Sequence, residues 1–399
     1  MVLHICGKKS EKMNVVLWIS AVVFIYATSQ KVEGNKNVVC YFASWTVYRP
    51  GNGKFDVENI DPTLCTHINF GFVGIMDNGT LRIIDPWESN DDGLHGFRRL
   101  VALKNPNVKV MVSMGGWNEG AAKFSSVAND PALRNNLISS VISFIEKYNF
   151  DGFDLDWEYP GSREGSNPKI DPENYITLLK ELKAKLQPRG YLLTAAVAGG
   201  VERTDVGYRV KDVSSLLDMI NVMTYDFHGF FDNYVGHGAP LYKSHYDIGP
   251  INETLNVAAG IEHWIELGAD PAKLNMGVVT YGRSFTLADP NNRQPYAPIT
   301  GGGHAGPYMR QAGFLGYNEI CELHSDWTYE WNEEMKVPFR YKGDQLVGYD
   351  DVRSMTEKVL YANSKKLGGI MIWSLDTDDF RGICGEAYPL LKTIHKNLK

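Results

Sequence analysis

The sequence has 399 residues, of which 44% are hydrophobic and 12% aromatic, so the chain can bury a large core and is not intrinsically disordered. Its formal net charge is −7, which argues against a nucleic-acid partner or an anionic membrane surface. A neutral polymer remains compatible with this charge.

The first 29 residues have the layout of a secretory signal peptide. A lysine-bearing stretch over residues 8–12 precedes an apolar run over 15–27, and the small residues Ala27 and Ser29 fit a cleavage site. A signal anchor is the alternative, but a bilayer requires about 20 apolar residues, more than this run offers. We therefore expect a secreted, soluble mature chain that begins near Gln30, whether translation starts at Met1 or Met13.

Four cysteines follow that segment: Cys40, Cys65, Cys321 and Cys384. An even number of cysteines in an oxidising compartment predicts two disulfides. Three pairings are possible, and we favour Cys40 with Cys65 and Cys321 with Cys384 because these pairs close the shortest loops.

Two sequence triplets fit the pattern for N-glycosylation. They are Asn78-Gly-Thr and Asn252-Glu-Thr. Either one can be modified only if the chain enters the secretory pathway, so these sites depend on the prediction of secretion.

Eight short runs rich in Val, Ile, Phe, Tyr and Met predict buried parallel strands, because they are too short for helices and mostly lack alternation. The runs span residues 37–45, 67–75, 109–117, 150–158, 191–199, 219–227, 274–282 and 369–376. Amphipathic helix patterns lie between them, and Asp130-Pro131 and Asp171-Pro172 each provide an acidic cap and a proline at the first helical position. Eight strand–helix units predict a (β/α)8 TIM barrel, with a doubly wound open sheet as the alternative.

The interval between the seventh and eighth runs is the longest of the series. Within it, residues 283–348 contain Gly- and Pro-rich turns, several aromatics and Cys321, which predicts a small α+β insertion on the top face of the barrel. The barrel as a whole is expected to span residues 37–399. The sequence ends soon after Asp376, so we expect no further domain after the eighth strand.

Three acids occupy alternate positions of the fourth run. Asp154, Asp156 and Glu158 therefore share one face of a core strand, and their α-carbons rise by roughly 6.6 Å per step toward its carboxyl end. Barrel active sites lie at that end. Burying even one unpaired carboxylate costs several kcal/mol, so these acids are poorly explained as structural residues. Crowded carboxyls cannot all ionise, and a raised pKa suits a general acid.

A divalent-metal site is the chemical alternative for clustered carboxylates. No histidine or second acidic cluster accompanies this run, so we expect neither a metal nor a cofactor. Asp151 is out of phase with the other three acids and is interpreted as a structural turn residue.

Aromatic and polar residues gather near the predicted carboxyl ends of the strands. Trp45, Trp117, Trp157 and Trp373 fall there and offer flat surfaces for sugar rings, although core packing explains any single tryptophan equally well. The segments Met223-Thr-Tyr225-Asp226 and Tyr281-Gly-Arg283 add hydroxyl, carboxylate and guanidinium groups to the same rim.

From about Val38 onward the sequence resembles family 18 glycoside hydrolases, the animal chitinases and chitinase-like lectins, and within these the secreted arthropod-type chitinases. The motifs are Cys40-Tyr-Phe-Ala-Ser-Trp45, Ser113-Met-Gly-Gly-Trp117-Asn, Asp151-x-x-Asp154-x-Asp156-x-Glu158, Met223-Thr-Tyr225-Asp226 and Trp373. The resemblance implies an endo-chitinase that cleaves β-1,4 links between N-acetylglucosamine units of chitin or chitooligosaccharides. It gives no reason to expect more than a monomer.

The resemblance also implies roles for individual residues. Glu158 protonates the leaving oxygen, and Asp156 orients the substrate's own acetamide, which replaces an enzymic nucleophile so that configuration is retained. Asp154 shares a proton with Asp156, while Tyr225 hydrogen-bonds the acetamide. Residues implied to line the sugar subsites are Trp45, Trp87, Gly116, Trp117, Asn118, Tyr159, Met223, Asp226, Tyr281, Arg283 and Trp373.

Two departures from the family pattern bear on function. Many relatives carry tryptophan on the leaving-sugar side, where this chain has Phe230-Phe231. We also expect no cysteine-rich C-terminal chitin-binding module, and hence weak binding to crystalline chitin. The alternative function is a non-catalytic chitin-binding lectin or growth-factor-like protein, but inactive relatives commonly lose the glutamate that this chain keeps as Glu158.

Overall fold

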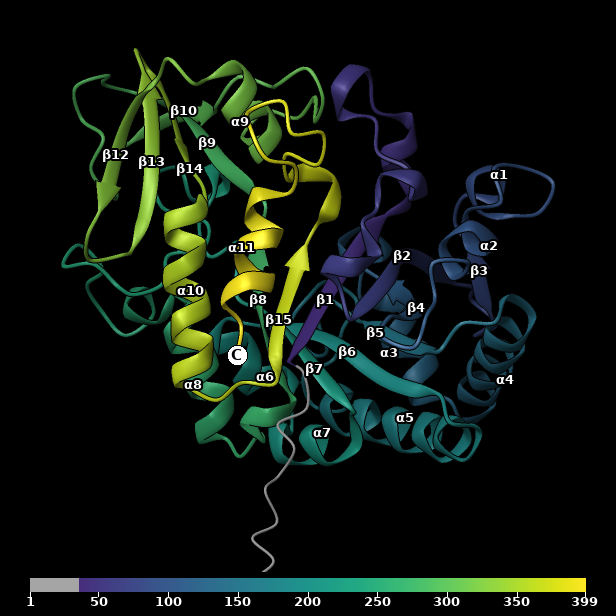
Figure 1. Ribbon diagram of the computed structural model, residues 1–399. Coiled ribbons are helices and arrows are strands. Elements are labelled where there is room, and N and C mark those ends of the chain that lie inside the picture. The colour runs from purple at the N-terminus through teal and green to yellow at the C-terminus, as the bar shows by residue number, and fades with distance from the viewer. Residues whose placement is uncertain (1–35) are drawn as a thin grey trace, which may run out of the picture. The chain divides into compact units, whose positions relative to one another are not determined.

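The structure is a computed structural model that describes residues 36–399 (Figure 1). The segment interpreted as a signal peptide, residues 1–29, lies outside the described residues. Over residues 36–399, none of the helices combines the length and the hydrophobicity needed to span a bilayer.

A closed barrel of eight parallel strands forms the centre of the fold (Figure 1). The strands are β1 (Asn37–Ala43), β2 (His67–Ile75), β4 (Lys109–Gly115), β5 (Gly152–Asp156), β6 (Leu192–Ala198), β7 (Met219–Met223), β8 (Leu274–Val279) and β15 (Gly369–Trp373). Strand β1 pairs in parallel with both β15 and β2, which closes the ring. The predicted TIM barrel is therefore confirmed, and the open doubly wound sheet is excluded. The short strand β3 (Leu81–Ile83) adds to β2 in the antiparallel sense.

Helices cover the outside of the barrel and share a continuous hydrophobic core with the strands. In chain order they are α1 (Pro86–Ser89), α2 (Gly96–Val101), α3 (Ala122–Asn129), α4 (Pro131–Tyr148), α5 (Asp171–Leu186), α6 (Val201–Gly207), α7 (Val210–Leu216), α8 (Val257–Glu266), α10 (Val352–Ser364) and α11 (Pro389–Asn397). Short 3-10 turns follow some strands, and two of them, η1 (Ser44–Tyr48) and η5 (Trp117–Glu119), lie at the carboxyl end of the barrel.

The two helix starts predicted from Asp-Pro pairs differ in their capping. Asp130 accepts hydrogen bonds from the backbone N–H groups of Ala132 and Leu133, as expected for a cap of α4. Asp171 is instead the first residue of α5, and its carboxylate accepts from the Ser125 hydroxyl and from backbone N–H groups in the preceding loop. Its role is to hold that loop, so the prediction of a capping aspartate was wrong for α5.

The insertion expected between the seventh and eighth strands is an antiparallel sheet with one short helix, at the upper left of Figure 1. Its elements are β9 (Tyr281–Leu287), β10 (Ile299–Gly302), β11 (Phe314–Gly316), α9 (Tyr317–Leu323), β12 (Thr328–Asn332), β13 (Val337–Lys342) and β14 (Gln345–Gly348). The seventh predicted run thus splits at Thr280, because β8 ends at Val279 and β9 belongs to the second sheet. A separate small core that includes Phe285 and Val337 stabilises this sheet.

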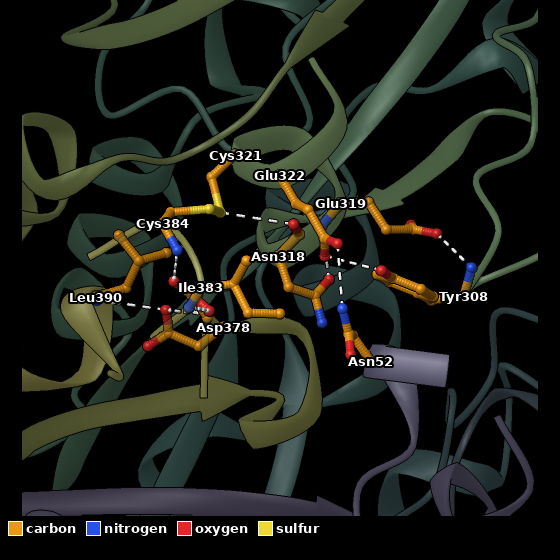
Figure 2. The surroundings of a disulfide bond; sticks show 11 residues. Asn52, Tyr308, Asn318, Glu319, Cys321, Glu322, Asp378, Ile383, Cys384 and Leu390 are labelled. Carbon is orange, nitrogen blue, oxygen red and sulfur yellow. Dashed lines mark hydrogen bonds between the residues drawn. A yellow bond between two sulfur atoms is a disulfide. The ribbon is translucent and has the colours of Figure 1, made fainter. Parts of the chain in front are cut away.

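Both disulfides have the pairing that closes the shortest loops. Cys40 in β1 bonds to Cys65 just before β2, and Cys321 in α9 bonds to Cys384 in the loop before α11 (Figure 2). Near the second bond, Asp378 accepts hydrogen bonds from backbone N–H groups at the start of α11, and Asp379 accepts from Cys384. This disulfide therefore ties the insertion to the segment that follows the last barrel strand.

Candidate active site

The carboxylate of Asp154 lies in the interior of the barrel and accepts hydrogen bonds from four other strands. Oδ2 accepts from the hydroxyls of Tyr41 at 2.6 Å and Ser113 at 2.7 Å. Oδ1 accepts from the Thr194 hydroxyl at 2.5 Å and the Asn221 amide at 3.3 Å. Burial raises the pKa of Asp154, and these four donors oppose that rise. The side chain is thus held in one orientation by a complete set of partners.

Asp156 lies one step nearer the carboxyl end of β5 and has a very different setting. It is buried, and within residues 36–399 its Oδ1 has no hydrogen-bond partner. Burial raises the pKa of Asp156 well above its usual range, and the charges of Glu158 and Asp154 raise it further. Burial without a partner for Oδ1 therefore favours the protonated form of Asp156.

The proton that we expected Asp154 and Asp156 to share is not shared through a direct contact in this conformation. No hydrogen bond joins these two side chains in the described part of the chain, because both oxygens of Asp154 are already taken by neighbouring donors. Proton sharing between the two acids therefore stays a prediction that requires Asp156 to turn.

Glu158 follows β5 on the same face and is 8% exposed. Burial raises its pKa to about 7, while the positive charges of Arg163 and Arg203 oppose the rise and the charge of Asp226 adds to it. A carboxyl with this pKa is protonated in a useful fraction at neutral pH, which is the requirement for a general acid.

Arg163 joins Glu158 to the rim and was not found from the sequence. Its guanidinium lies 3.8 Å from the centre of the Trp117 ring. Its Nη1 donates to the backbone carbonyl of Trp117 at 2.9 Å and to that of Glu158 at 3.2 Å. An arginine in a loop carries no pattern that reveals such contacts before folding.

Aromatic rings from several strands meet beside the acids. Trp373, at the end of β15, stacks on Phe72 with ring centres 5.6 Å apart, and Phe72 stacks in turn on Trp45 at 6.2 Å. The Tyr41 ring meets Trp373 edge-on at 5.5 Å. Trp45 is 44% exposed and Trp117 is 55% exposed, so flat apolar surface faces solvent here. Phe72 was missed because a phenylalanine in a core strand predicts only packing.

Trp157 does not belong to this group, and its interpretation as a rim tryptophan was wrong. It is buried and stacks on Phe124 of α3 at 5.7 Å, and it packs against Tyr175 of α5. The cause is the alternation of the strand: Asp156 and Glu158 face inward, so the residue between them faces the helices.

Asp226 organises the polar part of the rim. Its Oδ1 accepts from the Tyr281 hydroxyl at 2.8 Å and from Arg283 Nε at 2.8 Å, while its Oδ2 lies 2.7 Å from Arg283 Nη2. Tyr281 and Arg283 stand on β9 of the insertion, where we expected the end of a barrel strand. Tyr225 is half-buried and directs its hydroxyl to the sulfur of Met371 at 3.8 Å. That weak contact leaves the Tyr225 hydroxyl available to a stronger acceptor.

The remaining predicted site residues differ in their surroundings and exposure. Gly116 has φ of +80°, and a side chain there would collide with the Phe72 ring at 2.6 Å. Met223 is the last residue of β7, and Tyr159 is buried with Arg203 over its ring at 5.1 Å. Asn118 is exposed in η5 directly after Trp117, and Trp87 is exposed on α1 with no ring neighbour in the described residues.

A closed barrel with a row of acids along one strand, and with exposed aromatic rings at its carboxyl end, defines a glycoside hydrolase of the TIM-barrel class. Comparison with known proteins gives the family.

A model of the family described as glycosyl hydrolases family 18 matches residues 37–378. The endochitinase of Manduca sexta is 40% identical over 389 residues, which cover 94% of this chain and 70% of that protein. The crystal structure of the Ostrinia furnacalis Group IV chitinase in complex with allosamidin is similar with a TM-score of 0.88 and 44% identity, over 91% of this chain and 98% of that one. Human YKL-39, described as a pseudo-chitinase with retained chitooligosaccharide binding, is similar with a TM-score of 0.83 and 36% identity, over 91% of this chain and 99% of that one. The chain therefore belongs to glycosyl hydrolase family 18.

Proposed function

We propose that this protein is an endo-acting chitinase that hydrolyses β-1,4-linked N-acetylglucosamine polymers or oligomers with retention of configuration. The observation that carries the proposal is the setting of Glu158, a buried carboxyl with a pKa raised to about 7. A protonated acid at the rim of the barrel, supported by two further acids on the same strand, suits cleavage of a glycosidic bond.

In the proposed first step, Glu158 donates its proton to the glycosidic oxygen as the bond from that oxygen to the anomeric carbon breaks. The acetamide oxygen of the same sugar attacks the anomeric carbon, and Asp156 accepts a hydrogen bond from the acetamide N–H after turning toward it. Tyr225 donates a hydrogen bond to the acetamide oxygen. The charge of Asp154, which its four donors hold in place, contributes with burial and Glu158 to the raised pKa of Asp156.

In the second step, water attacks the anomeric carbon from the side that the leaving sugar vacated. The ionised Glu158 takes a proton from this water, and the bond to the acetamide oxygen breaks, which restores both the acetamide and the acid. Two displacements at one carbon return the original configuration. Trp373 offers the ring on which the reacting sugar stacks, and Trp45 and Trp117 extend that surface in the proposed complex.

The decisive test compares the wild type with Glu158→Gln on N-acetylglucosamine oligomers between pH 4 and 8. We expect kcat/KM to fall by at least 100-fold, because loss of general acid catalysis costs about 10²–10⁴ in rate. Glu164→Gln, at an exposed position of the following loop, is the matched control and should keep full activity.

Equal activity in the wild type and in Glu158→Gln would show that a residue other than Glu158 is the general acid. An inert wild type that still binds oligomers would instead identify a lectin, the alternative function on this fold. The anomeric form of the first product, followed by NMR, distinguishes retention from inversion.

We also propose that the chain is secreted and glycosylated and acts as a monomer. Two disulfides suit an oxidising compartment, and Asn78 is exposed in the turn after β2. Asn252 is half-buried, and its side-chain amide donates to the Ile248 carbonyl at 3.2 Å, so we expect lower glycan occupancy there. Expression in insect cells, with recovery from the medium of a glycosylated monomer that begins near Gln30, tests this proposal.

A further inference from the structure

A second concave surface lies between the insertion sheet and the start of α10. Its volume is about 550 Å³, inside the range of about 300–1,000 Å³ that is usual for ligand sites. Among the side chains that line it are Tyr329, Arg340, Tyr349, Asp351, Arg353 and Glu357. We call this surface the insertion groove. None of the acids or aromatic residues of the candidate active site lines it.

The strand register places the insertion groove on the face of the sheet opposite to Arg283. Ser284 in β9 pairs with Val347 in β14, Val347 pairs with Arg340 in β13, and Arg340 pairs with Tyr329 in β12. Directly paired residues share a face, and neighbours along a strand take opposite faces. Because Arg283 precedes Ser284, its side chain points away from the face that carries Tyr329 and Arg340. The groove is therefore separate from the active site.

The rings of Tyr329 and Tyr349 are held in fixed positions in the groove; Tyr349 is buried, whereas Tyr329 keeps open surface. Tyr329 is 40% exposed, and its hydroxyl donates to Asp351 Oδ2 at 3.0 Å. The Tyr349 hydroxyl accepts from Arg340 Nε at 2.9 Å, and the Arg340 guanidinium lies 5.6 Å from the centre of the Tyr329 ring. A ring fixed in this way loses little conformational entropy when a ligand stacks on it.

The charges of the groove favour a neutral ligand. Arg340 and Arg353 are balanced by Asp351 and Glu357, which also line the surface. The Nη1 of Arg340 already donates to the backbone carbonyls of Ser325 and Trp327 at 3.3 and 3.0 Å, so it is not free to bind an anion.

The groups that remain available can both donate and accept hydrogen bonds. Arg353 is stacked on Trp331, 3.7 Å from the ring centre, and its side chain is 54% exposed. The carboxylate of Glu357 stands on the same helix and lines the groove as an acceptor. The hydroxyl of Thr356 also lines it, but it donates to the Val352 carbonyl at 2.7 Å and can only accept from a ligand. The open ring of Tyr329 next to hydrogen-bond donors and acceptors is a surface that suits a sugar ring, since its C–H face is apolar and its hydroxyls are polar.

The geometry points to an accessory, non-catalytic binding site for a neutral saccharide in the insertion groove. The identity of that saccharide as an N-acetylglucosamine polymer rests on the proposed function. Bound there, a polymer strand is held to the enzyme at a point separate from the reacting bond, which raises its effective concentration at the active site.

The test measures adsorption to insoluble chitin in the Glu158→Gln background, so that the polymer is not degraded. Tyr329→Ala and Arg353→Ala are compared with Tyr242→Ala, a matched loss of a tyrosine that is 39% exposed and lies outside the groove. We expect at least a threefold loss of adsorption for the two groove variants and none for Tyr242→Ala. With Glu158 intact, kcat/KM for a soluble N-acetylglucosamine trimer should stay within twofold of the wild type for all three variants.

The inference would be overturned if the two groove variants adsorb to chitin as well as Tyr242→Ala does. It would also be overturned if their hydrolysis of the trimer falls as much as their adsorption. If Tyr329→Ala lowers the Tm by more than ten degrees, Arg353→Ala alone decides, because it removes no buried group. A wild type that fails to hydrolyse the trimer while the groove variants still lose adsorption would contradict the proposed function and leave the accessory site standing.

Discussion

At the scale of single residues, the three acids on β5 show what a sequence pattern can and cannot predict. Alternation along the strand predicted that Asp154, Asp156 and Glu158 face the barrel interior, because the side-chain period of a strand is two. The pattern did not predict that Tyr41 and Thr194 would saturate Asp154 and leave Asp156 unpaired. Those partners come from other strands, and their positions depend on the register of the closed barrel.

Arg163 is the residue whose role is best tested through pH. Its positive charge holds the pKa of Glu158 lower than burial alone would set it. In the wild type we expect kcat/KM to fall as pH rises through about 7, because the general acid then loses its proton. In Arg163→Met this basic limb should move to higher pH, and KM should rise because Trp117 loses the guanidinium on its ring.

The matched control is Arg209→Met, an exposed arginine paired with Glu173 on the outer surface. The fall of kcat/KM at high pH should occur at the same pH in Arg209→Met as in the wild type. If kcat/KM falls at the same pH in Arg163→Met and in the wild type, the Arg163 guanidinium does not lower the pKa of Glu158.

At the scale of elements, the strand count and the helix starts were predictable, while the junction of the two sheets was not. Eight apolar runs with helix patterns between them predicted the barrel, since each must bury both faces. The seventh run was predicted as one strand because Thr280 is itself a good strand former. In the structure β8 ends before Thr280 and β9 begins after it. Tyr281 and Arg283 therefore reach the rim from the insertion, which no local pattern reveals.

The disulfide between Cys321 and Cys384 is the covalent link between the insertion and the end of the barrel, and it closes a loop with a sequence separation of 63. Replacing both cysteines with serine should lower the free energy of unfolding by about 2–5 kcal/mol. Denaturant unfolding with and without a reductant measures the loss.

The comparison is a variant in which Cys40 and Cys65 are both replaced with serine. Its shorter separation of 25 should give the smaller loss in the chain-entropy model. The reverse order would show that packing around the bonds, rather than loop length, sets their contribution.

At the scale of the whole molecule, buried acids and buried histidines give opposite dependences of stability on pH. Burial raises the pKa of Glu158, Asp378 and Glu88 to about 7. The folded state then binds more protons than the unfolded state between the ordinary carboxyl pKa and 7, so stability falls as pH rises through that window. Burial lowers the pKa of His67 to about 4 and that of His237 to about 3, so these residues raise stability with pH up to about 6.5.

Above pH 6.5 the unfolded histidines lose their remaining protons within about one pH unit, so their contribution fades and the three acids dominate. We therefore expect the Tm to decrease between pH 6.5 and 8, as measured by calorimetry. Asp378→Asn removes one of the three acids and should make that decrease shallower. A Tm that is constant or rises over this interval would contradict the raised pKa values.

Thr280 has a consequence for how members of this architecture diverge. Its hydroxyl bonds to Ser374 and Thr377, its N–H donates to Trp373 at 3.2 Å, and its carbonyl accepts from Tyr317 at 2.9 Å. A residue inserted there would shift Tyr281 and Arg283 along the rim and change the width of the substrate path. A change of length in the outer hairpin turns of the insertion is free of that penalty, because those turns do not set the positions of Tyr281 and Arg283.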